Sequence, residues 1–264
     1  MQTTCGIVQV GRVCPQPTVD LGDGVHLPFV SLGTGSGLKN VNVTYATMLW
    51  LGAGGTGIDT AYNYRWMPVQ KHIAKGIAAA ASRVKLPRQR ERHVNDLGAD
   101  VFLITKIPCS TYDEAKRHIE SNLKDLQVSA VDLTLIHFRM SGCSLCGTSR
   151  ALEEAKEAGQ TRQIGVSHFI EKDFTELKTT AKVWPPALTQ NSLSVGFHDD
   201  ATIKYCAEHK IAYMVRPPLS TRAVRASRRM TSLRPRPVLA CAVLCCAVLC
   251  CAALRCAALR CAAL

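Results

Sequence analysis

The chain has no acidic residue and no lysine between positions 216 and 264, while the same segment holds nine arginines. Nine of the twelve excess positive charges therefore belong to this segment, and the first 215 residues are nearly neutral. Aromatic residues make up only 6% of the chain, and no basic stripe interleaved with them appears in the first part. We therefore expect no nucleic-acid binding by the folded part.

The first 25 residues lack the long apolar run of a secretory signal. No small disulfide framework is recognisable either, because seven of the thirteen cysteines lie after position 240 and the other six are scattered. Small secreted domains have a denser and more regular cysteine pattern. We therefore expect a reducing intracellular compartment and a cytoplasmic location.

The C-terminal tail lacks helical periodicity. A basic stretch leads into a five-residue repeat of Cys, Ala, Val, Leu and Arg, whose equivalent positions lie about 140° apart on a helix, so no apolar face accumulates. Residues 238–254 form seventeen consecutive apolar residues, the lower limit of a membrane span, and the last four residues match a prenylation signal that recurs within the repeat. We expect residues 222–264 to be a disordered or non-native tail. Membrane attachment is not expected, and the tail is the only candidate for it.

Apolar, β-prone runs alternate with amphipathic stretches in the rest of the chain, with a strand every 25–30 residues from position 101 onward. This alternation predicts parallel strands joined by right-handed crossovers. Seven barrel strands are predicted, at residues 30–37, 57–63, 99–107, 131–138, 162–169, 186–192 and 211–215. No eighth strand is recognisable.

Helices are predicted between these strands. They cover residues 43–51, 69–81, a segment opened by a capping-box pair of Ser110 and Asp113, 151–158, 171–181 and 201–209. Two short strands at 6–13 and 25–30 form an N-terminal hairpin, and the polar segment 83–100 is a solvated loop. The sequence thus predicts an α/β fold over residues 1–221, a TIM-type (β/α)8 barrel that is incomplete because strand eight is missing.

Four polar side chains stand at the ends of three predicted strands. They lie in the stretches GIDTAYNY, FLITK and DLTLIHF and are Asp59, Tyr64, Lys106 and His137. A barrel of parallel strands presents its chemistry at the carboxyl ends of the strands. We therefore expect the four side chains to meet at one end of the barrel.

These four side chains can form a general-acid system for the reduction of a carbonyl group. A tyrosine hydroxyl ordinarily has a pKa of about 10 and is a poor proton donor at neutral pH, but a neighbouring ammonium stabilises the phenolate and makes the hydroxyl a stronger acid. Lys106 is the candidate ammonium, and Asp59 would hold it in place. His137 would bind and orient the carbonyl oxygen of the substrate.

The segments that carry these residues resemble the aldo-keto reductases, a family of (α/β)8 barrels that use NADPH. The resemblance runs from about Val25 to Leu219 and comprises seven matches in the family's order. They are GDGVHLPFVSLGTG, GIDTAYNY, FLITK, SNLKDLQVSAVDLTLIHF, EEAKEAGQTRQIGVSHF, PPALTQNS and YCAEHKIAYMVRPPLS. The resemblance implies that an aldehyde or ketone is reduced to an alcohol by hydride transfer from NADPH.

The resemblance also implies a role for each matching residue. Tyr64 is the proton donor, with Asp59, Lys106 and His137 as its partners. The cofactor-binding residues that it implies are Thr34, Asp59, Ser167, His168, Gln190 and Arg216, and it implies no metal.

Three features differ from the family's usual pattern. His168 stands where the family usually has an asparagine that binds the nicotinamide carboxamide. Arg216 replaces the tyrosine that stacks on the nicotinamide ring. The Ile-Pro-Lys-Ser stretch of strand eight, which holds the 2′-phosphate and adenine of NADPH in the family, is absent.

Two other short patterns are weaker. Residues 52–57 spell G-x-G-x-x-G, but a strand rather than a helix is expected after them and positions 65–90 contain no acid, so a turn is the better interpretation. Cys143 and Cys146 spell C-x-x-C in the loop after the fourth barrel strand. Without a second pair at zinc spacing, they are interpreted as spare loop cysteines.

The residues leave three functions open. The first is an NADPH-dependent aldo-keto reductase that takes a small-molecule carbonyl substrate. The second is a catalytically impaired remnant of such an enzyme, and the third is a membrane-tethered regulatory or binding subunit with the same barrel. The identity of the carbonyl substrate and the oligomeric state cannot be read from the sequence.

Overall fold

The computed structural model describes residues 16–35, 40–64, 68–83, 101–139, 142–194 and 198–216. Nine strands are present in these ranges: β1 (Thr18–Asp20), β2 (His26–Pro28), β3 (Ser31–Gly33), β4 (Gly57–Asp59), β5 (Phe102–Ile107), β6 (Val131–Ile136), β7 (Thr161–Ser167), β8 (Leu188–Ser192) and β9 (Ala212–Arg216). The helices are α1 (Asn40–Gly52), the 3-10 helix η1 (Tyr62–Tyr64), α2 (Val69–Arg83), α3 (Tyr112–Leu126), α4 (Leu145–Glu157), α5 (Glu171–Thr180) and α6 (Asp200–Glu208).

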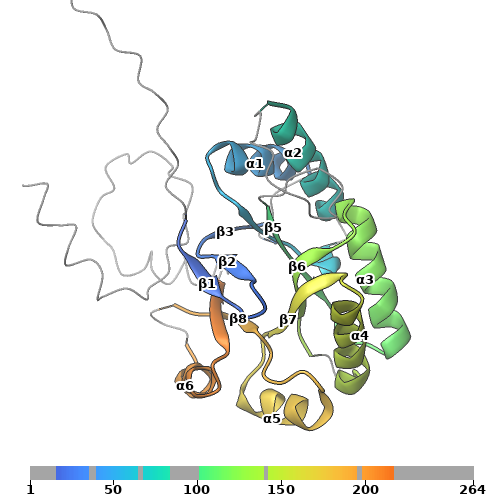
Figure 1. The fold of residues 1–264 in the computed structure, drawn as a ribbon, viewed down its shortest axis with the longest axis vertical. Helices are drawn as coiled ribbons and strands as arrows, with labels where there is room; N and C mark the ends of the chain where they lie inside the picture. Colours follow the sequence, from blue (N-terminus) through green and yellow to red (C-terminus); the bar gives the residue numbers. More distant parts are fainter. Residues whose placement is uncertain are drawn as a thin grey trace, which may run out of the picture.

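Seven strands form one parallel sheet in the order β3-β4-β5-β6-β7-β8-β9. The sheet is curled, and helices α1 to α6 lie around its outer face (Figure 1). Strands β3 and β9 are its two edges in the described part of the chain. This arrangement is an incomplete (β/α)8 barrel, as the sequence predicts, with seven barrel strands in the predicted order.

Two hydrophobic clusters hold the layers together. The larger one packs the outer face of the sheet against the helices. The smaller one fills the inside of the curled sheet, and it consists of Leu21, Val25, Leu27, Phe102, Ile104, Leu133, Leu135 and Leu188. Because alternate residues of a strand point to the same side, Lys106 follows Phe102 and Ile104 on the inner face of β5. His137 and Gln190 continue the inner faces of β6 and β8 in the same way.

The hairpin in the described residues uses a segment that the sequence predicts to be a loop. Its first strand is β1, within the loop that the sequence analysis placed between the two strands, and it pairs with β2 in antiparallel register. The hairpin contributes Leu21, Val25 and Leu27 to the inner cluster. The Gln163 side chain donates a hydrogen bond to the carbonyl oxygen of Leu21 at 3.0 Å. The hairpin is therefore held against the inside of the curled sheet.

Two helix starts differ from the predictions. The capping box of α3 consists of Thr111 and Glu114 rather than Ser110 and Asp113. The reason is tertiary, because the backbone N–H of Ser110 donates to the Thr148 hydroxyl at 2.8 Å and this hydroxyl donates back to the Ser110 carbonyl oxygen at 2.7 Å. Helix α4 begins at Leu145, six residues before the predicted start, and Ser144 caps it.

The interpretation of Cys143 and Cys146 as a spare pair is wrong. Cys143 forms a disulfide with Cys109, which follows β5, and Cys146 is a free, exposed cysteine in the first turn of α4. Sequence reasoning missed this bond because its two residues are 34 positions apart. Cys146 takes no part in this disulfide.

Several predictions fall outside the described residues: the strand at 6–13, nearly all of the loop at 83–100 and the tail at 222–264. Among the described helices, none is both long and apolar enough to cross a bilayer. The limits of the predicted domains, 1–221 and 222–264, stay predictions.

We expect Gly165→Ala to destabilise the fold by about 1–3 kcal/mol through overpacking. A Cβ at Gly165 in β7 would lie 2.5 Å from the Leu188 carbonyl oxygen of the neighbouring strand and 2.8 Å from Cδ2 of Leu135. Urea unfolding measures the change. Gly33→Ala in β3 is the matched control, because a Cβ there meets nothing within 4 Å. Equal stability of both variants would contradict the packing argument.

Candidate active site

The centre of the candidate site is an ion pair between neighbouring strands. Lys106 on β5 donates to Oδ1 of Asp59, the last residue of β4, at 2.5 Å and to the carbonyl oxygen of Thr60 at 2.9 Å. The Lys106 side chain is fully buried and that of Asp59 is 11% exposed. An ammonium has three N–H donors, so these two bonds leave one donor for a further partner.

Tyr64 lies beside this ion pair. It ends the 3-10 helix η1, which follows β4 directly, and its ring centroid is 5.8 Å from Nζ of Lys106. The Tyr64 hydroxyl lies against Gly35, because a Cβ on this glycine would collide with it. The phenol therefore reaches from η1 over the carboxyl end of β3. No other residue type fits at position 35 without moving the tyrosine.

His137 completes the group from the end of β6. Its ring lies 5.8 Å from that of Tyr64 at an interplanar angle of 81°, and its backbone N–H donates to the carbonyl oxygen of Ile107 at 2.8 Å. Nδ1 of its ring is 3.4 Å from Oδ1 of Asn63. The structure therefore brings Asp59, Tyr64, Lys106 and His137 together at one end of the sheet.

The imidazole of His137 is held in the neutral form. Burial is the main cause that lowers the pKa of His137 from 6.5 to about 3, and nearby positive charges, first that of Lys106, lower it further. A neutral imidazole has one N–H donor and one acceptor nitrogen. Asn63 therefore takes part in deciding which nitrogen carries the proton, and sequence reasoning missed it although it lies in the GIDTAYNY stretch.

A buried polar network outside the sheet supports Lys106. The side chain of Asn122 on α3 donates to the carbonyl oxygen of Lys106 at 3.3 Å and accepts a hydrogen bond from Gln70 on α2 at 2.6 Å. Gln70 also accepts from the Thr105 hydroxyl at 3.4 Å. These residues fix the end of β5 from its outer side. The sequence gives no signal for them, because they are polar positions on helices that otherwise pack through apolar side chains.

The predicted cofactor residues continue the same edge of the sheet. The Thr34 hydroxyl donates to the Asp59 carbonyl oxygen at 2.9 Å, and the Ser167 hydroxyl donates to the Gln190 carbonyl oxygen at 2.8 Å. His168 has a positive φ of 59° and its ring is 6.1 Å from that of His137. Thr34 follows β3, which pairs with β4, whereas Ser167 and His168 lie at the end of β7 and Gln190 lies on β8.

Two buried polar atoms near the ends of β8 and β9 have no partner in the described part of the chain and could contact a ligand. Within the described ranges, the buried Oε1 of Gln190 and Nε of Arg216 have no hydrogen-bond partner. Arg216 does donate from Nη2 to the Ser192 hydroxyl at 3.1 Å. Burial first, then the charges of Arg216 and Lys106, lowers the pKa of His168. The ends of β8 and β9 therefore offer a ligand one free acceptor, Oε1 of Gln190, and one free donor with a positive charge, Nε of Arg216.

Comparison with known proteins places the chain in a family. The model of the "Aldo/keto reductase family" matches residues 33–247. The chain belongs to the aldo/keto reductase family. An aldo/keto reductase structure from Brucella melitensis is 30% identical with a TM-score of 0.63, and the match covers 75% of this chain and 72% of that one. The structure of Bombyx mori aldo-keto reductase AKR2E4 in complex with NADP is 26% identical with a TM-score of 0.66, covering 76% and 66%.

Curated relatives agree with this assignment. "Estradiol 17 beta-dehydrogenase 5" of Mus musculus is 26% identical over 220 residues, which cover 74% of this aldo/keto reductase and 64% of the relative. The Bombyx mori AKR2E4 sequence is 25% identical over 217 residues, which cover 76% of this chain and 66% of the relative. The chain thus spans slightly less than two thirds of the length of these curated relatives.

We expect Asp59→Asn to destabilise the protein by about 3 kcal/mol, because it leaves the fully buried Lys106 ammonium without its counter-charge. The double variant Asp59→Asn/Lys106→Met should recover part of this loss. Urea unfolding of both single variants and the double variant measures the coupling. Asp125→Asn is the control, since its pair with the exposed Lys71 contributes less than about 1 kcal/mol. Additive effects at Asp59 and Lys106 would contradict the ion pair.

The stability of the protein should fall as the pH is lowered from 6.5 toward 3. The unfolded chain protonates His137 near pH 6.5 while the folded chain does not until about pH 3, so the unfolded state binds more protons in this window. We expect a loss of about 2 kcal/mol from this group between pH 7.5 and pH 5.

Urea unfolding at both pH values measures this loss. His137→Asn should reduce the pH dependence, whereas His26→Asn, at an exposed histidine, should leave it unchanged. If His137→Asn had the same pH dependence as the parent chain, the neutral buried imidazole would be refuted.

Proposed function

We propose that this aldo/keto reductase reduces an aldehyde or ketone to an alcohol, with NADPH as hydride donor and Tyr64 as proton donor. One observation carries the proposal: a phenol, an imidazole and a buried ammonium–carboxylate pair lie together at the carboxyl ends of β4, β5 and β6. Each of these groups has a function in protonating a carbonyl oxygen. Such an arrangement is a general-acid site rather than a structural cluster, because Tyr64 and His137 lie at the carboxyl ends of the strands, where barrels of this type carry their catalytic residues.

The cofactor proposal is supported by polar atoms at the ends of β7 and β8 that are free to bind a ligand. A carboxamide has two N–H donors and one carbonyl acceptor. Oε1 of Gln190 and the lone pairs of the Ser167 hydroxyl, whose proton is already donated, can accept from its NH2 group. The neutral ring of His168 can donate to its oxygen in place of the family's asparagine. These residues fit a nicotinamide, which supplies the hydride when bound.

The remaining candidate cofactor residues contribute position and charge. Thr34 follows β3 and Asp59 ends β4, whereas Arg216 ends β9, the edge strand on the other side of the described sheet. The phosphorylated cofactor is proposed because the Bombyx mori relative is solved with NADP. A dinucleotide that carries phosphates is also favoured by the positive charge of Arg216, which no carboxylate in the described residues neutralises through an ion pair.

The chain's own groups then divide the work of protonation. His137 donates its Nε2–H to the carbonyl oxygen and orients the substrate. This tautomer requires the Asn63 amide to turn, so that its NH2 group and not the Oδ1 atom, now 3.4 Å away, faces Nδ1. Tyr64 transfers its hydroxyl proton to the same oxygen as negative charge develops there. The third N–H of Lys106 stabilises the resulting tyrosinate, and Asp59 keeps the ammonium in place.

We expect Tyr64→Phe to lower kcat for carbonyl reduction by at least about 100-fold while the dissociation constant for NADPH stays the same. The proton donor is lost, but no proposed cofactor contact is removed. Steady-state kinetics with an aromatic aldehyde and fluorescence titration with NADPH measure the two quantities. Tyr45→Phe on the exposed face of α1 is the matched control and should have parental kinetics.

The two measurements separate the proposal from its alternatives. Saturable NADPH binding with full activity of Tyr64→Phe would refute the role of this tyrosine. A parent chain that shows no saturable change in fluorescence with NADPH would instead indicate the catalytically impaired remnant.

A further inference from the structure

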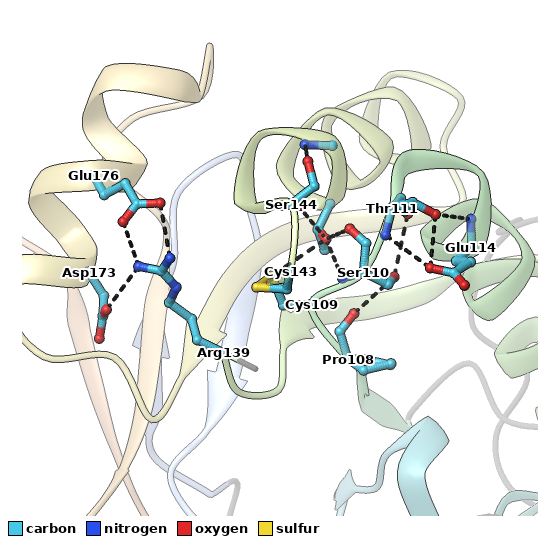
Figure 2. Close-up of a disulfide and its surroundings, with 12 residues drawn as sticks. Pro108, Cys109, Ser110, Thr111, Glu114, Arg139, Cys143, Ser144, Asp173 and Glu176 are labelled. Atoms are coloured by element: carbon cyan, nitrogen blue, oxygen red, sulfur yellow. Dashed lines mark hydrogen bonds and ion pairs between the residues drawn. A yellow bond between two sulfur atoms is a disulfide. The ribbon is translucent and has the colours of Figure 1, made fainter. Parts of the chain in front are cut away.

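The disulfide between Cys109 and Cys143 joins two loops at the end of the barrel that holds the candidate active site. Cys109 lies three residues after Lys106, and Cys143 lies just before α4 (Figure 2). Cys146, the next cysteine along the chain, is free and exposed. Three cysteines are therefore gathered at the entrance to α4, and the proposed carbonyl reduction uses none of them.

The two sulfur atoms of this disulfide differ in their access to solvent. Cys109 is only 4% exposed, whereas Cys143 is half-buried. An attacking thiolate must reach one sulfur and displace the other, and access decides which one it attacks. The geometry favours attack on Cys143, with the buried Cys109 sulfur as the leaving group.

Cys146 is placed to take over the bond to Cys143. Only Ser144, which caps α4, and Leu145, its first residue, lie between the two cysteines. Cys146 is exposed in the first turn of α4, so its thiol is accessible for this attack.

The surrounding loop is anchored independently of the disulfide. On one side Arg139 forms ion pairs with Asp173 at 3.2 Å and Glu176 at 2.6 Å (Figure 2). On the other side the Thr148 hydroxyl is bonded to both backbone groups of Ser110. Exchange at Cys143 can therefore occur without unfolding the barrel.

We propose that Cys109, Cys143 and Cys146 form a thiol–disulfide exchange site that reacts with an external thiol. The external thiolate attacks Sγ of Cys143, the bond to Cys109 breaks, and the Cys109 thiolate takes up the proton that the external thiol lost. Cys146 then loses its proton and attacks Sγ of Cys143. A Cys143–Cys146 disulfide forms, and the external thiol leaves with that proton, so the exchange involves no net oxidation or reduction.

Reduced glutathione is the probe that tests this site in the full-length chain. After a short incubation, remaining thiols are alkylated and the protein is digested with trypsin without reduction. Cleavage after Lys106, Lys116, Arg139 and Arg150 puts Cys109 in peptide 107–116 and the other two cysteines in peptide 140–150. Before incubation the two peptides should be linked.

After incubation, peptide 107–116 should be alkylated, and peptide 140–150 should be lighter by two hydrogen atoms than its reduced form. In Cys146→Ser the second step is blocked, so the glutathione adduct on peptide 140–150 should accumulate several-fold above its level in the parent chain. Cys206→Ser is the matched control, because Cys206 is free but buried, and burial raises its pKa to about 11.

Three results would overturn the proposal: peptides that are unlinked before incubation, peptides that stay linked in the folded chain after it, or equal adduct levels in Cys146→Ser and the parent chain. The readout does not depend on carbonyl reduction. The proposal can therefore fail or hold independently of the reductase function.

Discussion

The buried ion pair between Lys106 and Asp59 is the constraint on which the geometry of the candidate site depends. Strand β4 ends at Asp59, which is paired with Ile104, while β5 continues to Ile107. Lys106 thus lies on β5 beyond the end of β4. Its ammonium contacts the turn that leads from β4 to η1. Removing two charges from water is costly unless they are paired and hydrogen-bonded. The bonds to Asp59 and to the Thr60 carbonyl oxygen meet this requirement and hold η1, with Tyr64 on it, in place.

Around this pair the site is short of negative charge. Arg216 has no carboxylate partner in the described part of the chain, and the sequence after position 208 contains no acid at all. The positive charges of Arg216 and Lys106 lower the pKa of the neighbouring histidines. At neutral pH these histidines therefore act as uncharged hydrogen-bonding groups. Arg216 would therefore attract an anionic ligand, and no carboxylate in the described residues is paired with its guanidinium.

The sequence predicted the strands and their end residues because both follow from local pattern. An apolar run that ends on a polar residue fixes which side chain points inward at the carboxyl end, as for Lys106 and His137. The predictions failed where two local patterns compete or where distant segments meet. Ser110 and Thr111 each precede an acid by three residues, and only the contact of Ser110 with Thr148 decides between them. Asn122, Gln70 and the partner of Cys143 have no local signal of any kind.

The position of each residue in the sheet separates the two halves of the site. Asp59 and Lys106 lie on β4 and β5, and His137 directly follows β6. Each of these strands is paired on both sides, so its hydrogen bonds hold these residues in place. Thr34 and Arg216 lie instead at β3 and β9, the two edges of the described sheet. A cofactor that contacts both would reach from one edge strand of the described sheet to the other. The likeness to the family continues to residue 247, beyond β9. The proposed proton transfer therefore depends on the middle of the sheet, whereas the proposed cofactor contacts depend on the positions of its two edge strands.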